Sequence, residues 1–179
     1  MSVPHGVVIR DLAPHADERG VLVELFRSEW DLGPAPVQWN CVHSRSGTLR
    51  GVHVHPFHSD FLTVISGHLQ LCVHDIRKDS PTCGHSALLS MTGAEPLLAF
   101  VPPGVAHGFY FAEPTTYVYG LTTPWSMDEE IGCRWDSPEL GIVWPVTNPI
   151  LSERDAAAGS YADMVSDFEA KQAAGLGTG

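Results

Sequence analysis

The chain has few basic residues, few cysteines and no long apolar run, and each shortage excludes a class of protein. Ten Lys and Arg against 21 Asp and Glu give a formal net charge of −11, which disfavours binding to nucleic acid or to an anionic membrane surface. No apolar run approaches the roughly 20 residues of a membrane-spanning helix, and the first residues lack the pattern of a signal peptide. We therefore expect a soluble cytoplasmic protein that holds any anionic ligand in a locally basic pocket.

The four cysteines, Cys41, Cys72, Cys83 and Cys133, are scattered along the chain without a CxxC pair. A secreted scaffold held together by disulfides would need a denser framework. We interpret these residues as ordinary reduced thiols, mostly buried. With 179 residues, the chain has the length of one domain and buries a core without cross-links.

What the chain does have is a series of short β-forming segments separated by turn residues. They predict nine strands, over residues 21–26, 38–43, 51–55, 61–65, 69–75, 86–90, 97–101, 108–111 and 117–121. Many short strands at such spacing indicate an all-β sandwich or barrel. In the segment 69–75, Leu69, Leu71 and Val73 occupy every second position, so one face of this strand is expected in the core.

The stretch from Ser152 to Ala174 is Ala-rich, charged and free of proline. It predicts one or two short surface helices, followed by a Gly-rich disordered tail. We expect a single domain over residues 1–179, with its core at about 7–150 and a C-terminal helical segment over 151–174.

Three histidines and one carboxylate are spaced so that they can meet inside a small β-barrel. His53 and His55 lie two apart on a predicted strand and so point to the same side. Asp60 follows after a short turn, and His107 arrives on a later strand behind a Pro-Gly corner. Three imidazoles and a carboxylate are sufficient ligands for Zn, Fe, Mn or Ni. One interpretation is therefore a divalent metal site formed by His53, His55, Asp60 and His107.

These residues and their surroundings resemble the dTDP-4-dehydrorhamnose 3,5-epimerase family, nucleotide-sugar epimerases of the cupin superfamily. The resemblance runs from about Val7 to Ala158. Its motifs, in the family's order, are Asp17-Glu18-Arg19-Gly20, Leu49-Arg50-Gly51-Val52-His53, Asp75-Ile76-Arg77-Lys78-Asp79-Ser80-Pro81-Thr82, Pro102-Pro103-Gly104-Val105-Ala106-His107-Gly108-Phe109, Trp135-Asp136-Ser137-Pro138 and Leu151-Ser152-Glu153-Arg154-Asp155. The resemblance implies a double-stranded β-helix, or jelly roll, usually a homodimer that exchanges a strand between subunits. It also implies an enzyme that needs no cofactor and acts on a dTDP-4-keto-6-deoxy sugar, a nucleotide-diphosphate sugar.

The resemblance also implies roles for individual residues. A ketone at C4 acidifies the protons at C3 and C5, so a base can remove one and an acid on the opposite face can return a proton with inverted configuration. His53 would be the base, Asp155 the partner that orients it, and Tyr119 the acid. Arg19 and Arg50 would bind the diphosphate, because a planar guanidinium grips phosphate oxygens in pairs. Further substrate-binding positions would be Gln38, Asn40, His107, Trp125, Glu130 and Arg154.

Two positions depart from the family's pattern. The chain has His55 where the family commonly has glutamine, and Asp60 where the family has a lysine beside the sugar's keto oxygen. Losing one electrostatic partner of a developing oxyanion costs roughly 3–4 kcal/mol of barrier. Three functions stay open: a lysine-free epimerase acting at C3, C5 or both, a metal-dependent cupin isomerase, lyase or oxygenase, and a non-catalytic sugar-nucleotide-binding protein. They conflict at His53, which cannot be a free base and a metal ligand at once.

Overall fold

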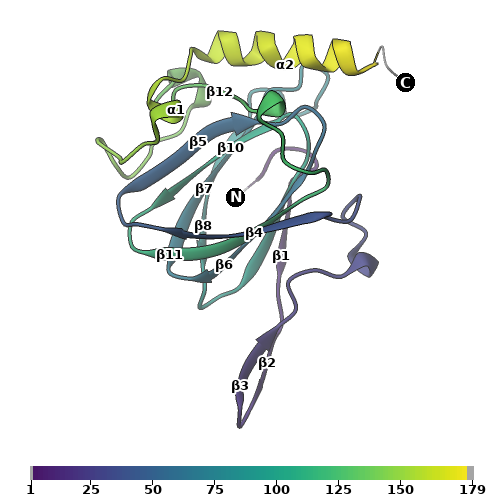
Figure 1. Ribbon diagram of the computed structural model, residues 1–179, viewed down its shortest axis with the longest axis vertical. Coiled ribbons are helices and arrows are strands. Elements are labelled where there is room, and N and C mark those ends of the chain that lie inside the picture. Colours follow the sequence, from purple (N-terminus) through teal and green to yellow (C-terminus); the bar gives the residue numbers. More distant parts are fainter. Residues whose placement is uncertain (1, 177–179) are drawn as a thin grey trace.

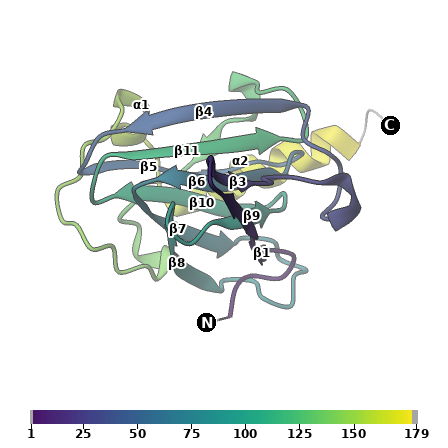
Figure 2. The same cartoon turned by 90° about the horizontal axis from the view of Figure 1, so that it is seen from below.

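Two five-stranded antiparallel sheets face each other and enclose a jelly-roll barrel (Figures 1 and 2). The computed structural model describes residues 2–176. The disordered tail was predicted to begin after residue 174, but the C-terminal helix continues to Leu176; residues 177–179 lie outside the described range. One sheet has the strand order β1-β9-β6-β11-β4 and the other β12-β5-β10-β7-β8. The strands are β1 Val8–Asp11, β2 Pro14–Asp17, β3 Gly20–Val23, β4 Gln38–Ser44, β5 Thr48–Val54, β6 Asp60–Ser66, β7 His68–Asp75, β8 Ser86–Thr92, β9 Leu97–Val101, β10 Val105–Phe111, β11 Thr115–Leu121 and β12 Ile131–Gly132.

The predicted all-β jelly roll is confirmed, and all nine predicted strands are present, eight of them with shifted limits. The largest shifts at one end are three residues: the first predicted strand ends at Val23 instead of residue 26, and β5 and β10 each begin three residues earlier than predicted. The structure adds β1, β2 and β12, which the sequence patterns did not indicate because these strands are short and two of them carry charged residues. Three short 3-10 helices, Ser28–Trp30, Met127–Glu129 and Pro138–Leu140, lie in connections, and the C-terminal segment forms α1 Glu153–Ala156 and α2 Tyr161–Leu176.

The space between the sheets is filled by apolar side chains from both of them. Leu69, Leu71 and Val73 of β7 are completely buried there, as the alternation in the sequence predicts. They pack with residues of the facing strands, among them Leu62 of β6 and Tyr117 of β11. Burial of such side chains is the main favourable contribution to the folding of the barrel.

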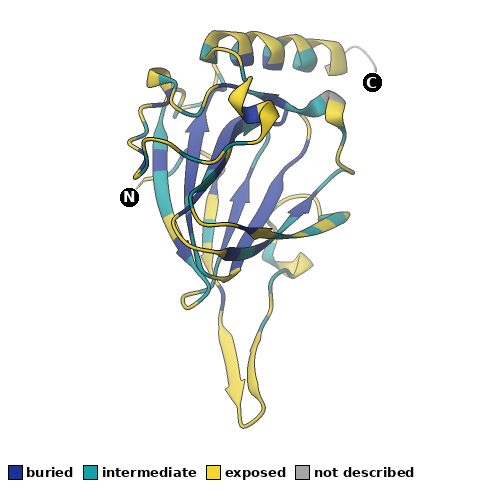
Figure 3. Cartoon of the chain, turned by 60° about the vertical axis from the view of Figure 1, so that its left-hand side comes forward, coloured by how far each residue is buried: buried dark blue, intermediate teal, exposed yellow. Residues whose placement is uncertain are grey.

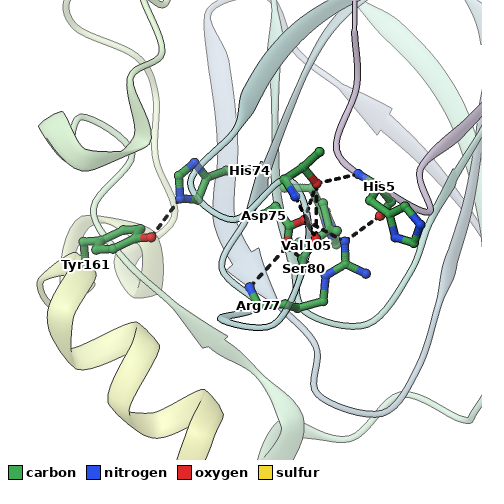
Figure 4. Close-up of polar contacts among 9 residues, drawn as sticks. His5, His74, Asp75, Arg77, Ser80, Val105 and Tyr161 are labelled. Carbon is green, nitrogen blue, oxygen red and sulfur yellow. Dashed lines mark hydrogen bonds and ion pairs between the residues drawn. The ribbon is translucent and has the colours of Figure 1, made fainter.

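The helix α2 lies over one end of the barrel (Figure 3). On the opposite face of β7, Cys72 and His74 are buried as well, whereas His68 and Gln70 are half-buried. Cys72 belongs to a second apolar cluster with Met164 and Phe168 of α2. His74 on the same face bonds through Nε2 to the Tyr161 hydroxyl, 2.8 Å away, at the start of α2 (Figure 4). The alternation predicted one core face, and the structure shows two, because α2 forms a further layer outside the sheet.

The motif that begins at Asp75 forms a structural corner at the end of β7 (Figure 4). The buried Asp75 carboxylate accepts hydrogen bonds from Arg77 Nε at 2.8 Å and from the hydroxyls of Ser80 and Thr82. Arg77 also donates to the backbone carbonyl of His5 and so holds the N-terminal segment against this corner. Burial raises the pKa of Asp75, but these hydrogen bonds outweigh it and hold that pKa well below its ordinary value.

A hairpin of β2 and β3 projects from the barrel and is exposed along almost its whole length (Figures 1 and 3). Its apolar residues Val21 and Leu22 are 67% and 61% exposed. Within residues 2–176, no helix is long and apolar enough to cross a membrane. All four cysteines are free; Cys72 and Cys133 are buried, whereas Cys41 and Cys83 are exposed, so the expectation of burial is wrong for those two.

Candidate active site

A cavity of about 480 Å³ opens between the two sheets at one end of the barrel. Strands β5, β6, β10 and β11 supply most of its wall; residues of β4 and β9, the turn after β5 and the segments 125–130 and 152–155 complete it. A concave site with apolar walls and a few convergent polar groups is typical of small-molecule binding. Ten residues predicted from the sequence line it: Arg50, His53, His55, Asp60, His107, Tyr119, Trp125, Glu130, Arg154 and Asp155.

A β-bulge in β5 lets Arg50 and His53 face the cavity together. Residues three apart on a regular strand point to opposite faces, but the register of β5 against β10 shifts by one residue between these two positions. The extra residue restores the same orientation. At the bulge, Gly51 has a φ of +111°, and a Cβ there would lie 2.8 Å from the Cα of Gly108. Only glycine fits this position, which explains why the Arg-Gly-Val-His motif contains one.

His53 and Asp155 form a hydrogen-bonded pair at the cavity. Nε2 of His53 lies 2.7 Å from Oδ1 of Asp155, which is the contact that the pairing hypothesis requires. Asp155 lies in α1, where the Ser152 side chain accepts a hydrogen bond from its backbone N–H at 3.1 Å and so caps the helix. Burial raises the pKa of Asp155, but the hydrogen bond and charge of His53 outweigh it and bring that pKa below its ordinary value. An ionised Asp155 can only accept, so Nε2 of His53 is the donor in this contact.

A chain of polar contacts continues from this pair toward the outside. The Arg154 guanidinium lies 2.8 Å from Oε2 of Glu130 and 3.1 Å from Nε2 of His53. Because Nε2 donates its proton to Asp155, its approach to the Arg154 guanidinium joins two donors and is not a hydrogen bond in this state. The Trp125 indole donates to the other oxygen of Glu130 at 2.7 Å, and its backbone N–H donates to Gln38 at 2.8 Å.

Tyr119 of β11 lines the same cavity and is partly buried. Burial raises the pKa of its phenol, and the negative charges of Asp60 and Glu130 raise it further. The phenol therefore keeps its proton and is available as a donor. Its neighbour Tyr117, which the sequence interpretation missed, also lines the cavity and stacks on Tyr119 with ring centroids 6.1 Å apart.

Deeper in the cavity, three histidines surround Asp60. Nε2 of His55, His58 and His107 lies 4.0, 3.9 and 3.9 Å, respectively, from Oδ2 of Asp60, and all four side chains are buried. Burial and the charge of Glu130 raise the pKa of Asp60 well above its ordinary value, whereas burial lowers the pKa of His107 to about 3.

The composition of this group differs from the predicted metal site. Among the described residues, the ligand atoms within 4.8 Å of one another belong to His55, His58 and Asp60. His53 is engaged with Asp155 instead, and His107 contacts the group through Asp60. His58 was missed because it lies in the turn between β5 and β6, outside the histidine spacing that indicated the site.

Three predicted substrate-binding residues do not line the cavity. Arg19 lies at the turn of the projecting hairpin and forms an ion pair with Asp17 at 2.6 Å. Gln38 and Asn40 lie on β4, where the Gln38 side chain donates to that of Asn40 at 3.1 Å. The Asn40 amide nitrogen is buried without a hydrogen-bond partner. Gln38 is linked to the rim of the cavity because its side chain accepts a hydrogen bond from the backbone of Trp125, which lines the cavity. Arg19 does not line the cavity of its own chain.

Comparison with known proteins identifies the same family as the sequence motifs do. The sequence model of the dTDP-4-dehydrorhamnose 3,5-epimerase family matches residues 3–163. The chain is 35% identical over 167 residues to a dTDP-4-dehydrorhamnose 3,5-epimerase of Sinorhizobium fredii, covering 86% of this chain and 84% of the relative. Its structure is similar to the rmlC epimerase of Mycobacterium tuberculosis, with a TM-score of 0.82 and 29% identity over 96% of this chain and 88% of that one. A 3'-monoepimerase from Streptomyces bikiniensis in complex with dTDP-quinovose also has a TM-score of 0.82, with 26% identity over 96% of both chains.

Proposed function

The chain belongs to the dTDP-4-dehydrorhamnose 3,5-epimerase family and is an epimerase of dTDP-linked 4-keto-6-deoxy sugars, and from this premise we propose that His53 and Asp155 are its catalytic base pair. The observation that carries the proposal is the 2.7 Å contact between His53 Nε2 and Asp155 Oδ1 at the wall of the cavity. In this proposal His53 transfers a proton and is not a metal ligand.

The proposed reaction moves one proton off the sugar and another onto it. His53 takes the proton from the carbon next to the ketone, and the electron pair of that C–H bond moves to the keto oxygen to give an enolate. Asp155 stabilises the imidazolium that forms. Tyr119 then donates its phenolic proton to the opposite face of the same carbon, which inverts the configuration. Exchange with water returns a proton to Tyr119 and removes one from His53.

Arg50 and Arg154 are the proposed partners of the diphosphate. Both line the cavity of a chain whose formal net charge is −11, so the basic groups for an anionic ligand are concentrated where it would bind. Nε of Arg50 donates a hydrogen bond to the Ser44 hydroxyl at 3.1 Å. This contact leaves the outer nitrogens of the guanidinium available for phosphate oxygens. Trp125, 45% exposed at the rim, offers a surface on which a ring can stack.

We also propose that the active protein is a homodimer. The projecting hairpin exposes Val21 and Leu22 and keeps Arg19 away from its own cavity, which suits a segment that pairs with a second chain. Exchange of this hairpin would bury the two apolar side chains. Light scattering at micromolar concentration should give twice the 19.4 kDa mass of the chain; a mass of one chain would contradict the proposal.

The proposed activity is tested by proton exchange in deuterium oxide. A dTDP-4-keto-6-deoxy sugar incubated with the protein should gain deuterium at C3, at C5 or at both, and invert there; the number of labelled positions distinguishes a monoepimerase from a 3,5-epimerase. dTDP-glucose is the matched control, because it lacks the ketone and its C–H protons are not acidic. Binding of the keto sugar without deuterium uptake would contradict catalysis and leave a sugar-nucleotide-binding protein.

A further inference from the structure

We propose that His55, His58 and Asp60 bind a divalent transition-metal ion such as Zn²⁺ in the wall of the cavity, and that the fourth position of the ion stays open toward the cavity. The part of the proposal that concerns catalysis rests on the proposed epimerase function, whereas the binding itself does not. The ion would place a positive charge beside the buried Asp60, in the wall of the cavity.

The first argument is the convergence of three ligand atoms. One ligand atom each of His55, His58 and Asp60 lies within 4.8 Å of the others. Nε2 of His55, His58 and His107 surrounds one carboxylate oxygen of Asp60 at 3.9–4.0 Å, and these separations are too long for hydrogen bonds. Ligand atoms roughly 2.0–2.2 Å from a tetrahedral Zn²⁺ lie roughly 3.3–3.6 Å apart, so binding of an ion would draw the three ligand atoms closer together.

The second argument is the orientation of the imidazole rings. Nδ1 of His58 lies 3.2 Å from a carboxylate oxygen of Glu129, and Nδ1 of His107 lies 3.3 Å from the backbone carbonyl of Val105. Each of these oxygens can only accept, so each Nδ1 carries the proton and each Nε2 presents a lone pair. A carboxylate or a backbone carbonyl behind the ring is the arrangement that orients metal-binding histidines.

The third argument is that a buried nitrogen of this group has no hydrogen-bond partner among the described residues. Nε2 of His58 is buried without such a partner, and it faces Asp60 at a distance too long for a hydrogen bond. Buried polar groups in folded proteins are nearly always paired. A cation between His58 and Asp60 would satisfy both groups together.

The ligand types select the class of metal. Imidazole nitrogens together with one carboxylate suit Zn²⁺, Fe²⁺ or Mn²⁺, whereas Mg²⁺ and Ca²⁺ prefer sites made of oxygen. When His53 removes the sugar proton, the electron pair arrives at the keto oxygen. A metal ion with an open position toward the cavity would bind that oxygen and stabilise the enolate as a Lewis acid.

Metal binding is tested on the protein without substrate. After dialysis against a chelator, titration with Zn²⁺ should give about one tight site per chain, and Co²⁺ in its place should show visible d–d absorption bands. Asp60→Asn and His58→Gln should each weaken binding by about 100-fold or more, at least as much as losing a partner outside the ligand set. His68→Gln is the matched control, because His68 lies outside the cavity and bonds to Ser90; it should bind as the wild type does.

The results separate the metal site from the reaction. The absence of a stoichiometric site, or equal binding by Asp60→Asn and the wild type, overturns the metal site, and the Co²⁺ spectrum shows this independently of activity. Full deuterium uptake by metal-free protein overturns the Lewis-acid role. Tight Zn²⁺ binding without any deuterium uptake, with or without metal, supports the site and instead contradicts the proposed epimerase function.

Discussion

The cavity contains two groups of histidine and carboxylate that differ in how closely the partners approach. In the pair of His53 and Asp155 the nitrogen and oxygen are 2.7 Å apart, so one proton lies between them. Around Asp60 the nearest imidazole nitrogens stay at 3.9–4.0 Å. The first distance suits a group that moves protons, and the second leaves room for a cation. Residue types alone do not distinguish a base from a ligand; the separation of the polar atoms does.

The two groups have different origins in the fold although His53 in β5 and His55 and His58 in the turn after it are close in the sequence. Asp155 comes from the C-terminal helix α1, 102 residues after His53. Asp60 comes from β6, the next strand along the chain, and His58 from the turn between. The base thus depends on a distant segment that docks on the barrel, while the group around Asp60 is mostly local.

The largest expected effect is that of His53→Asn, which separates the two groups. Removing the base should lower the rate of deuterium uptake by about 10³- to 10⁴-fold, because no other group at that wall accepts the proton. Zn²⁺ affinity should stay as in the wild type. His43→Asn is the matched control, because His43 is an exposed residue of β4 that bonds to Thr116 outside the cavity; this variant should keep the full rate. Loss of metal together with activity in His53→Asn would show that the two groups are not independent.

A smaller effect is expected from Tyr119→Phe. Without the phenol, epimerised product should fall by about 100-fold or more. Deuterium uptake with retained configuration should continue, because His53 still removes a proton and returns one to the same face. Nuclear magnetic resonance of the sugar distinguishes the two outcomes. Equal loss of uptake and inversion would mean that Tyr119 is not the acid of the opposite face.

The smallest effect on activity is expected from Asp75→Asn, because Asp75 belongs neither to the pair of His53 and Asp155 nor to the group around Asp60. Asp75 is buried against Arg77, so breaking this pair should lower the free energy of unfolding by about 3–5 kcal/mol near neutral pH. The rate per folded molecule should not change. Urea unfolding followed by circular dichroism measures the stability difference.

The difference in the free energy of unfolding between the wild type and Asp75→Asn should depend on pH, because the pKa of Asp75 is lowered in the folded protein. A carboxyl whose folded pKa is depressed stabilises the protein above its ordinary pKa of 3.8 and loses this contribution as the pH falls toward the folded pKa. The difference in the free energy of unfolding between the wild type and Asp75→Asn should therefore become smaller as the pH falls below 3.8. If this difference does not change with pH, the charge of Asp75 does not cause it.

The sequence predicted the barrel well because alternation and turn residues act locally. The strand from Leu97 to Val101 was predicted to the residue. The contact of His53 with Asp155 was predicted only through resemblance, because no spacing connects residues so far apart. His58 could not be found, because the path of a turn decides where its ring lies. Arg19 was placed in the site by its motif, but the hairpin carries it away from its own cavity.

The docking of α1 makes the activity depend on a part of the protein that the barrel does not need for its own strand pairing. Local opening of residues 152–155 would withdraw Asp155 and Arg154 from the cavity while the two sheets stayed paired. Mild heating, a low concentration of denaturant or cleavage near the exposed Ile150 would then inactivate the enzyme before the barrel unfolds. Catalytic rate is in this sense a reporter of local unfolding at the C-terminal end, and the midpoint of inactivation should precede the midpoint of global unfolding.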